Sequence, residues 1–499
     1  MSVVLYDAYA RKLVRDLLFG NFCIGDYREH VAFNGEDYVI YKVCVLFAEI
    51  LTQELTHAVA EIDRNRIAFF QCLSHNVYTF NISITAWPAL IYTGCSIYII
   101  HFLSKIISNT LTQFGYNRVW ENMTMYDFDS IVNRNTPDDI KYEKINGIDD
   151  LIPLWVADMD FKSPPEVIDE LVHVASNGVY GYSEADKSYD DAVINWFKTR
   201  FDWEFTSDQF IKLPGVVLAI SYAVRVLTND NDHVMIFEPV YGPFRRCVEG
   251  NGRKLTIEQL KIVNGRFEVD IEEMEKKIVE DDVKLLIWCS PHNPGGRVWT
   301  EDELIAVADI CKKHGVFIVS DEIHSDLTLY GNRHIPMAKI AGDNCVVLTA
   351  PTKTFNIAGI QAANIVSSNK DVLKKIDKEA LTTGAFGLNK MGIEATRAAY
   401  TYGASWLDEL LKYIEGNVAL LREELKNTDL VMMEPEGTYL VWIDCSSHKN
   451  FAMKLLKDAH VRVSEGSFFG LGGENFIRVN VACPRSVLKE AIKRMKAVL

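Results

Sequence analysis

A lysine follows an apolar run in the stretch CVVLTAPTKTFNIAG, which spans residues 345–359. The run 345–348 is typical of a buried strand, and Pro351 and Gly359 bracket a turn that carries Lys353. Burial of an unpaired ammonium group lowers its pKa, and a neutral lysine amine forms a Schiff base with an aldehyde. The position of Lys353 therefore indicates carbonyl chemistry.

Four more polar side chains follow apolar runs of the same kind. Tyr241 lies in EPVYGPF, Asn293 in SPHNPGGRVW, and Asp321 and His324 lie in VSDEIHSD. Each has an ordinary structural explanation when it is taken alone, as a turn residue, a helix N-cap or a satisfied core histidine. Together with Lys353 they form a set that one chemistry requires.

The elements that carry this set alternate between strand and helix. The predicted strands at 234–237, 285–289, 316–319 and 345–348 are apolar on both faces, which favours a parallel sheet covered by helices. A helix is predicted over about 301–314, because Thr300 and Glu303 form a capping box and Gly315 follows as a C-cap. The pattern indicates a doubly wound α/β domain, in which ligands bind beyond the carboxyl ends of the strands.

Pyridoxal phosphate (PLP) would use every member of the set. Lys353 supplies the amine for its aldehyde, and Asp321 keeps its ring nitrogen protonated. Asn293 and His324 donate to its phenolic oxygen, and Tyr241 covers the face of its ring.

The phosphate of the same cofactor needs backbone N–H groups at the start of a helix. The stretch LPGVVLAISYAV, residues 213–224, supplies a glycine turn that leads into an apolar helix. We expect Gly215, Val216 and Val217 to donate to the phosphate and the hydroxyl of Thr352 to add a contact.

Several separated motifs resemble the fold-type I PLP-dependent enzymes of the class I/II aminotransferase superfamily. The resemblance is greatest to the C–S β-lyase group, the cystathionine β-lyases of the MalY/PatB type. It covers residues from about 125 to 499 and leaves residues 1–122 out. The matching stretches, in chain order, are LWVADMDF, VYGYSEA, PGVVLAI, EPVYGPF, PHNPGGRVW, SDEIHSDL, TAPTKTFNIAG, EGTYLVWID and FIRVNVACPR.

The resemblance implies further site residues. Arg478 matches the arginine that grips the α-carboxylate of an amino-acid substrate, where a planar fork binds in a bidentate way. Tyr182 matches a tyrosine that reaches the cofactor phosphate of the neighbouring subunit, which implies a homodimer with shared sites. Trp155 and Ala157 match the segment that lines the substrate pocket.

The activity implied is α,β-elimination from cystathionine or other S-conjugates of cysteine, which releases a thiol, pyruvate and ammonia. Lys353, Asp321 and Tyr241 are the expected catalytic residues. Two departures favour a lyase over a standard aminotransferase: Gln361 replaces a phosphate-binding arginine, and Ala350 replaces a serine. An aminotransferase and a non-catalytic PLP-binding regulatory protein remain as alternatives.

The resemblance also implies the domain plan. We expect a large PLP-binding domain over residues 165–405, with a mainly parallel central sheet covered by helices. Residues 125–164 and 406–499 should form a smaller α+β domain, mostly C-terminal.

Residues 1–122 form an extension of unknown role with a helical leaning and no chemical motif. The segment 84–103 has no charged side chain over a length that would span a bilayer. Pro88 and several polar residues favour a helix buried in protein instead. The N-terminus lacks the features of a signal peptide.

The net charge and the cysteine content of the chain limit the partners and cofactors that it can have. A formal net charge of -16 over 499 residues argues against nucleic acid and anionic membrane, since both bind basic patches. Ten scattered cysteines without a CxxC pair suggest neither a zinc site nor a disulfide framework. We therefore expect a cytoplasmic enzyme that acts on a small amino-acid substrate and needs no metal.

Overall fold

The computed structural model describes residues 126–134, 136, 138–145 and 148–499. The chain divides after Asn122 into two units, and the described residues belong to the second. The predicted extension 1–122 and its uncharged segment 84–103 lie outside the described residues. Within the described part, no helix is both long and apolar enough to cross a membrane.

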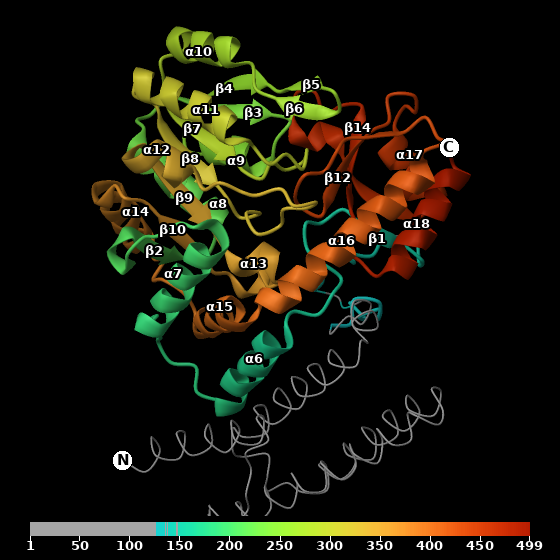
Figure 1. The fold of residues 1–499 in the computed structure, drawn as a ribbon, viewed down its shortest axis with the longest axis horizontal. Helices are drawn as coiled ribbons and strands as arrows, with labels where there is room; N and C mark the ends of the chain where they lie inside the picture. Colours follow the sequence, from blue (N-terminus) through green and yellow to red (C-terminus); the bar gives the residue numbers. More distant parts are fainter. Residues whose placement is uncertain (1–125, 135, 137, 146–147) are drawn as a thin grey trace, which may run out of the picture. The chain divides into compact units, whose positions relative to one another are not determined.

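The larger sheet has seven strands in the order β2-β10-β9-β8-β7-β3-β4 (Figure 1). Five neighbouring strands are parallel, and β10 runs antiparallel to both of its neighbours, β9 and β2. The prediction of a mainly parallel central sheet is therefore confirmed. The strands are β2 (Phe210–Leu213), β3 (His233–Glu238), β4 (Lys254–Gln259), β7 (Val283–Cys289), β8 (Phe317–Asp321), β9 (Cys345–Thr349) and β10 (Ala363–Val366).

Alternate side chains of the central strands enter two separate cores, one on each face of the sheet. In β3, Met235 and Phe237 belong to one core, and Val234 and Ile236 belong to the other. This is the two-residue period of a strand whose two faces are both covered. It explains why these strands are continuous apolar runs in the sequence.

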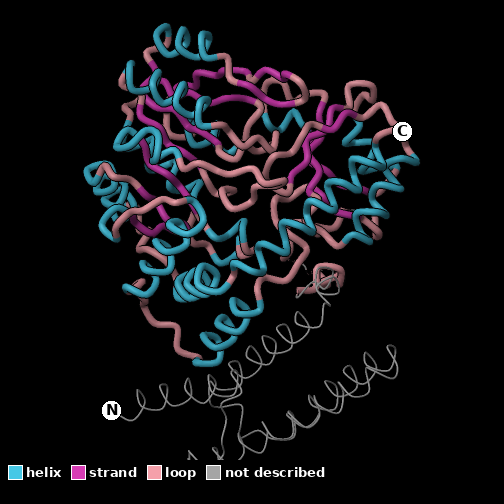
Figure 2. Tube along the Cα trace, in the orientation of Figure 1, coloured by secondary structure: helices cyan, strands magenta, loops and turns pink. Residues whose placement is uncertain are grey.

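Helices cover both faces of this sheet, and Figure 2 shows them (cyan) around the strands (magenta). One face packs against α8 (Val216–Leu227), α9 (Pro243–Glu249) and α14 (Lys370–Thr382). The other face packs against α7 (Lys187–Phe201), α10 (Ile271–Glu280), α11 (Glu301–His314) and α12 (Met337–Ala341). The predicted helix 301–314 is confirmed as α11, with its capping box and a left-handed Gly315.

The smaller sheet has the order β1-β13-β14-β12-β11, in which only β1 and β13 pair in parallel. Its strands are β1 (Ile152–Leu154), β11 (Val431–Met432), β12 (Leu440–Asp444), β13 (Val461–Glu465) and β14 (Phe476–Asn480), and β5 (Lys261–Val263) with β6 (Arg266–Glu268) forms a separate hairpin. Strand β1 thus joins strands that lie some three hundred residues further along the chain. We propose that the two sheets mark two domains, residues 165–405 and residues 125–164 with 406–499.

The remaining helices are α6 (Pro165–Asn177), α13 (Pro351–Thr354), α15 (Lys390–Tyr402), α16 (Ala404–Leu425), α17 (Phe451–Asp458) and α18 (Arg485–Ala497). The long helix α16 contacts α15 and α18, and in Figure 1 it runs from α15 toward α18 beside the smaller sheet. It therefore connects the regions of the two sheets. The short helix α13 begins directly after β9 and carries Lys353.

Candidate active site

Lys353 lies in α13, a single helical turn that Pro351 begins where the sequence indicated a turn. Its Nζ donates to the carbonyl of Ala157 at 2.6 Å. No carboxylate within the described residues forms an ion pair with it. Burial lowers the pKa of Lys353 to about 8, and nearby Asp158 and Asp321 only partly oppose this effect. An appreciable minority of the amine is therefore neutral near physiological pH, in contrast to an ordinary exposed lysine.

Asp321 is the last residue of β8 and is buried. The only hydrogen bond to its carboxylate within the described chain comes from the N–H of Ile323, at 3.2 Å. Burial raises the pKa of Asp321 to about 7. The neighbouring Glu322 is equally buried, yet its oxygens accept from three groups, the Ser320 hydroxyl, the His334 ring and the Met337 N–H. Of two adjacent buried acids, only Asp321 is left open to a further group.

His324 and Arg478 add two more incompletely satisfied groups. His324 is buried, and its Nδ1 has no hydrogen-bond partner among the described residues. Burial lowers its pKa to about 3, so its ring is neutral. Arg478 lies in β14, where burial lowers its pKa to about 10 and its Nε also has no partner in the described part.

The guanidinium of Arg478 contacts two other predicted residues. Its Nη1 donates to Asn293 Oδ1 at 2.9 Å, and its Nη2 donates to the carbonyl of Trp155 at 2.7 Å. Ser464, which the sequence did not single out, accepts a further bond from Nη2 at 3.1 Å. The smaller sheet thus carries Arg478 to Asn293, which follows the end of a strand of the larger sheet.

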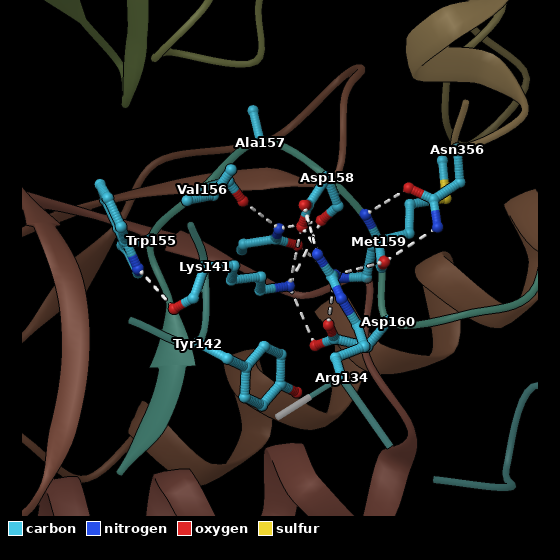
Figure 3. A network of polar contacts seen from close by, with 12 residues as sticks. Arg134, Lys141, Tyr142, Trp155, Val156, Ala157, Asp158, Met159, Asp160 and Asn356 are labelled. Atoms are coloured by element: carbon cyan, nitrogen blue, oxygen red, sulfur yellow. Dashed lines mark hydrogen bonds and ion pairs between the residues drawn. The ribbon is translucent and has the colours of Figure 1, made fainter. Parts of the chain in front are cut away.

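The segment 155–160 connects the two basic side chains, because Arg478 and Lys353 donate to the carbonyls of Trp155 and Ala157. Figure 3 shows what holds this segment in place, a group that we call the clamp: Arg134, Lys141, Asp158 and Asp160. Lys141 is buried between the two aspartates, with Nζ–O distances of 3.3 Å to Asp158 and 2.9 Å to Asp160. Arg134 pairs with the same two carboxylates at 2.7 and 2.9 Å.

Sequence reasoning missed the clamp and two further residues that touch this segment. Tyr439 donates its hydroxyl to the carbonyl of Ala157 at 3.0 Å, beside the Lys353 amine. Asn356 accepts from the N–H of Met159 at 2.9 Å. Tyr439 lies within EGTYLVWID and Asn356 within TAPTKTFNIAG, so both motifs contained a signal that was not assigned to a residue.

The predicted phosphate site is the start of α8. Gly215 is the N-cap, no side chain caps the helix, and the first bond into the helix runs from the Ala219 N–H to the Gly215 carbonyl. The N–H groups of Val216 and Val217 precede that bond and suit an anion at the positive end of the helix. Thr352 is buried in α13.

Two tyrosines occupy different places. Tyr241 is half-buried just before α9, and burial together with the charge of Asp321 raises the pKa of its hydroxyl. Tyr182 is fully exposed in the loop between α6 and α7, and within the described chain its side chain forms no hydrogen bond with another predicted residue. Ala350 is the buried N-cap of α13, and Gln361 is exposed.

These observations fit PLP, residue by residue. A partly neutral amine, an open buried acid, an unpaired ring nitrogen and a bare helix N-terminus match an aldehyde, a pyridinium nitrogen, a phenolic oxygen and a phosphate. The residues that would hold the cofactor are Lys353, Asp321, Asn293, His324, Tyr241, Gly215, Val216, Val217 and Thr352.

Comparisons with known proteins agree with this chemistry. The sequence model of the family described as Aminotransferase class I and II matches residues 149–495. The chain is 38% identical over 387 residues to cystathionine beta-lyase PatB of Bacillus subtilis, covering 75% of this chain and 100% of PatB. It is 32% identical over 385 residues to protein MalY of Escherichia coli, covering 74% and 97%. The solved structure of cystalysin from Treponema denticola, which contains a PLP cofactor, matches with a TM-score of 0.73 and 34% identity over 75% of this chain and 99% of cystalysin.

Proposed function

The chain belongs to the aminotransferase class I and II family and is a PLP-dependent carbon–sulfur lyase, and from this premise we propose that it cleaves cystathionine and related S-conjugates of cysteine. The observation that carries the proposal is the set of incompletely satisfied groups on the half-buried Lys353 and on the buried Asp321, His324 and Arg478. Buried charges without partners are costly, and an amino-acid substrate with its cofactor supplies the partners.

The cofactor, when bound, supplies an electron-withdrawing ring that acidifies the α-carbon of the substrate. Asp321 would hold a proton on the ring nitrogen, a role that suits a buried carboxyl group with no competing partner. Asn293 and His324 would donate to the phenolic oxygen, and the start of α8 would hold the phosphate. Tyr241 would lie against the ring.

Arg478 would bind the α-carboxylate of the substrate. Its Nε has no partner within the described chain, while its Nη1 is shared with Asn293. A bidentate carboxylate needs two adjacent N–H groups, and an Arg478 freed from one of its present bonds provides them. Trp155 and Ala157 would orient Arg478 and Lys353 through their carbonyls.

Lys353 would act as the base. Its Nζ removes the proton from the α-carbon, and the Cβ–S bond then breaks so that the leaving group departs as a thiolate. Lys353 returns the proton to the sulfur, and hydrolysis of the three-carbon fragment by one water gives pyruvate and ammonia. A pKa of about 8 lets the same amine accept and return a proton near neutral pH.

A coupled assay separates this function from its alternatives. Protein loaded with PLP and supplied with cystathionine should release pyruvate and thiol in equal amounts with no keto-acid acceptor present. An aminotransferase would instead require the acceptor, and a non-catalytic binding protein would release neither product. The replacements Gln361 and Ala350, together with the intact set of site residues, support the lyase.

Exposed apolar and aromatic side chains favour a homodimer as the active form. Val179, Tyr180 and Tyr182 lie in the loop between α6 and α7, Phe386 lies in the loop between α14 and α15, and all four are exposed. Such side chains gathered on a surface are typical of an interface between chains. There the hydroxyl of Tyr182 would reach the cofactor phosphate of the partner subunit.

The cysteines support a cytoplasmic location. All six cysteines in the described part of the chain are free and buried. Unpaired thiols persist in a reducing compartment. Fractionation of cells that express the protein, with activity measured in each fraction, would test this location.

A further inference from the structure

A cavity of about 200 Å³ lies between the end of β3, the start of α9 and the loop before β14. Two hydrogen bonds fix its walls to each other. The N–H of Val240 donates to the carbonyl of Phe469 at 2.8 Å, and the N–H of Leu471 donates to Glu238 Oε2 at 2.9 Å. The cavity is thus a hollow between two tied segments, with room for several water molecules or a short side chain.

The cavity adjoins the candidate active site through two shared aromatic side chains. Phe469 lines the cavity, and the guanidinium carbon of Arg478 lies 4.8 Å from the centre of its ring. Tyr241, which would cover the cofactor, also lines the cavity. The pKa of the Tyr241 hydroxyl is raised mainly by burial. Its charged form also interacts electrostatically with Asp321 and Arg478 of the site and with Arg246 of the cavity. Phe469 and Tyr241 are therefore walls that the cavity shares with the site, beside the place where Arg478 would hold a substrate.

Two adjacent arginines line the cavity, and their charges are used differently. Arg245 pairs with the buried Glu238 at 2.8 Å and with Glu249 at 3.1 Å. The guanidinium of Arg246 has no ion pair and no hydrogen bond within the described residues. Arg246 is the exposed member of the pair. The cavity therefore offers one free cation to an incoming group.

We propose that this cavity receives the leaving-thiol half of the substrate and that Arg246 binds a carboxylate carried on that half. The inference rests on the proposed function and narrows its substrate class. Substrates would be S-conjugates of cysteine whose thiol ends in a carboxylate, as the homocysteine half of cystathionine does. S-conjugates with a neutral alkyl group would fill the cavity without meeting the cation.

A matched pair of substrates isolates the contact. S-(3-carboxypropyl)cysteine and S-butylcysteine have chains of similar length and differ mainly in the terminal carboxylate. With PLP-loaded wild-type protein, we expect kcat/KM for the carboxylate substrate to exceed that for the butyl substrate. Arg246→Ala should reduce kcat/KM for the carboxylate substrate by about 5- to 10-fold, the range of one partly shielded charge-assisted hydrogen bond.

Three controls accompany this variant. In Arg246→Ala, kcat/KM for S-butylcysteine should stay within about 2-fold of wild type. Arg246→Lys should restore part of the preference, because a lysine keeps the charge but not the fork. Arg333→Ala removes another exposed arginine that does not line the cavity, and it should leave the ratio of the two substrates unchanged.

The outcomes distinguish this inference from the proposed function. Equal losses for both substrates, or no loss for the carboxylate substrate, would overturn the role of Arg246 while pyruvate release still supported the lyase. Failure of the wild-type protein to release pyruvate from any S-conjugate would overturn the proposed function itself. A carboxylate preference that is unaffected by salt would also contradict an exposed ion pair.

Discussion

Two groups of buried charge meet at the segment 155–160, and they are built in opposite ways. In the clamp, Arg134 and Lys141 face Asp158 and Asp160, and each charge has at least two partners of opposite sign. In the candidate active site, Lys353 and Arg478 donate to neutral oxygens, and Asp321 accepts from one backbone N–H. The same segment thus separates a neutralised cluster from an open one.

The difference helps to distinguish buried charged groups that stabilise the fold from those that bind a ligand. Removing one partner from a paired cluster leaves a costly uncompensated charge, so a paired cluster stabilises the fold. An open cluster lowers the stability of the empty protein and keeps its groups available for a ligand. On this basis we propose that the clamp is structural and positions the segment, whereas Lys353, Asp321, His324 and Arg478 are functional.

The largest effect on activity is expected from a substitution of Lys353, in the open cluster. Lys353→Ala should reduce lyase activity by about 10⁴-fold or more, because both the attachment of the cofactor and the proton transfers depend on this amine. The visible absorbance of lysine-bound PLP should disappear, while the thermal unfolding of the cofactor-free protein should be unchanged or shifted upward. Retained absorbance together with retained activity would remove Lys353 from its role.

A substitution in the clamp should lower the stability of the fold. Lys141→Met keeps most of the volume of a fully buried side chain but removes a charge from two aspartates. We expect a loss of about 3 kcal/mol in the free energy of unfolding, measured by urea denaturation of the cofactor-free protein. The double variant Lys141→Met/Asp160→Asn should regain part of it, since both sides of the pair are then neutral. Equal stability of wild type and Lys141→Met would contradict the structural role.

In the cofactor-free protein the ionised carboxylate of Asp321 should lower the stability of the fold, whereas the clamp charges raise it. Its pKa of about 7 in the folded state exceeds the ordinary 3.8, so the folded protein binds an extra proton between these values and loses stability as the pH rises through them. Asp321→Asn should abolish this contribution, which is about 4 kcal/mol at most above pH 7. Urea denaturation at pH values from 5 to 8 would measure it. Parallel pH profiles of the two proteins would show that Asp321 is not an open buried acid.

Substitution of Arg478 should have the smallest of these effects, and the effect should be on the affinity for the substrate. Arg478→Ala should raise KM for cystathionine by about 10- to 150-fold, the equivalent of a charge-assisted contact of about 1.5–3 kcal/mol. Arg478→Lys should restore only part of the affinity, because a lysine cannot form the bidentate contact. A KM equal to that of wild type would assign the α-carboxylate to another residue.

The sequence predicted the larger sheet well because its strands are continuous apolar runs with distinct polar residues at their ends. It therefore placed Asn293, Asp321 and Lys353 at one edge of the sheet, where the structure has them. It also predicted helix 301–314 from its caps. These features are local, so short stretches of chain encode them.

Features that depend on distant partners could not be predicted in this way. Asp321 and Glu322 are adjacent acids at the end of the same strand. Only the folded structure shows that His334 and Met337 form hydrogen bonds with Glu322 and not with Asp321. Lys141 gave no signal because its aspartate partners lie in a separate stretch of the chain. The role that we propose for the exposed Tyr182 likewise depends on a second chain.

The central claim is that the open cluster holds PLP through Lys353. Borohydride reduction of the PLP-loaded protein fixes the cofactor to the lysine that holds it, and peptide mass spectrometry then identifies that lysine. We predict that the pyridoxyl group is found on the peptide that contains Lys353 and that the clamp lysine, Lys141, is unlabelled. A label on any other lysine, or no label on a protein that releases pyruvate, would contradict the account.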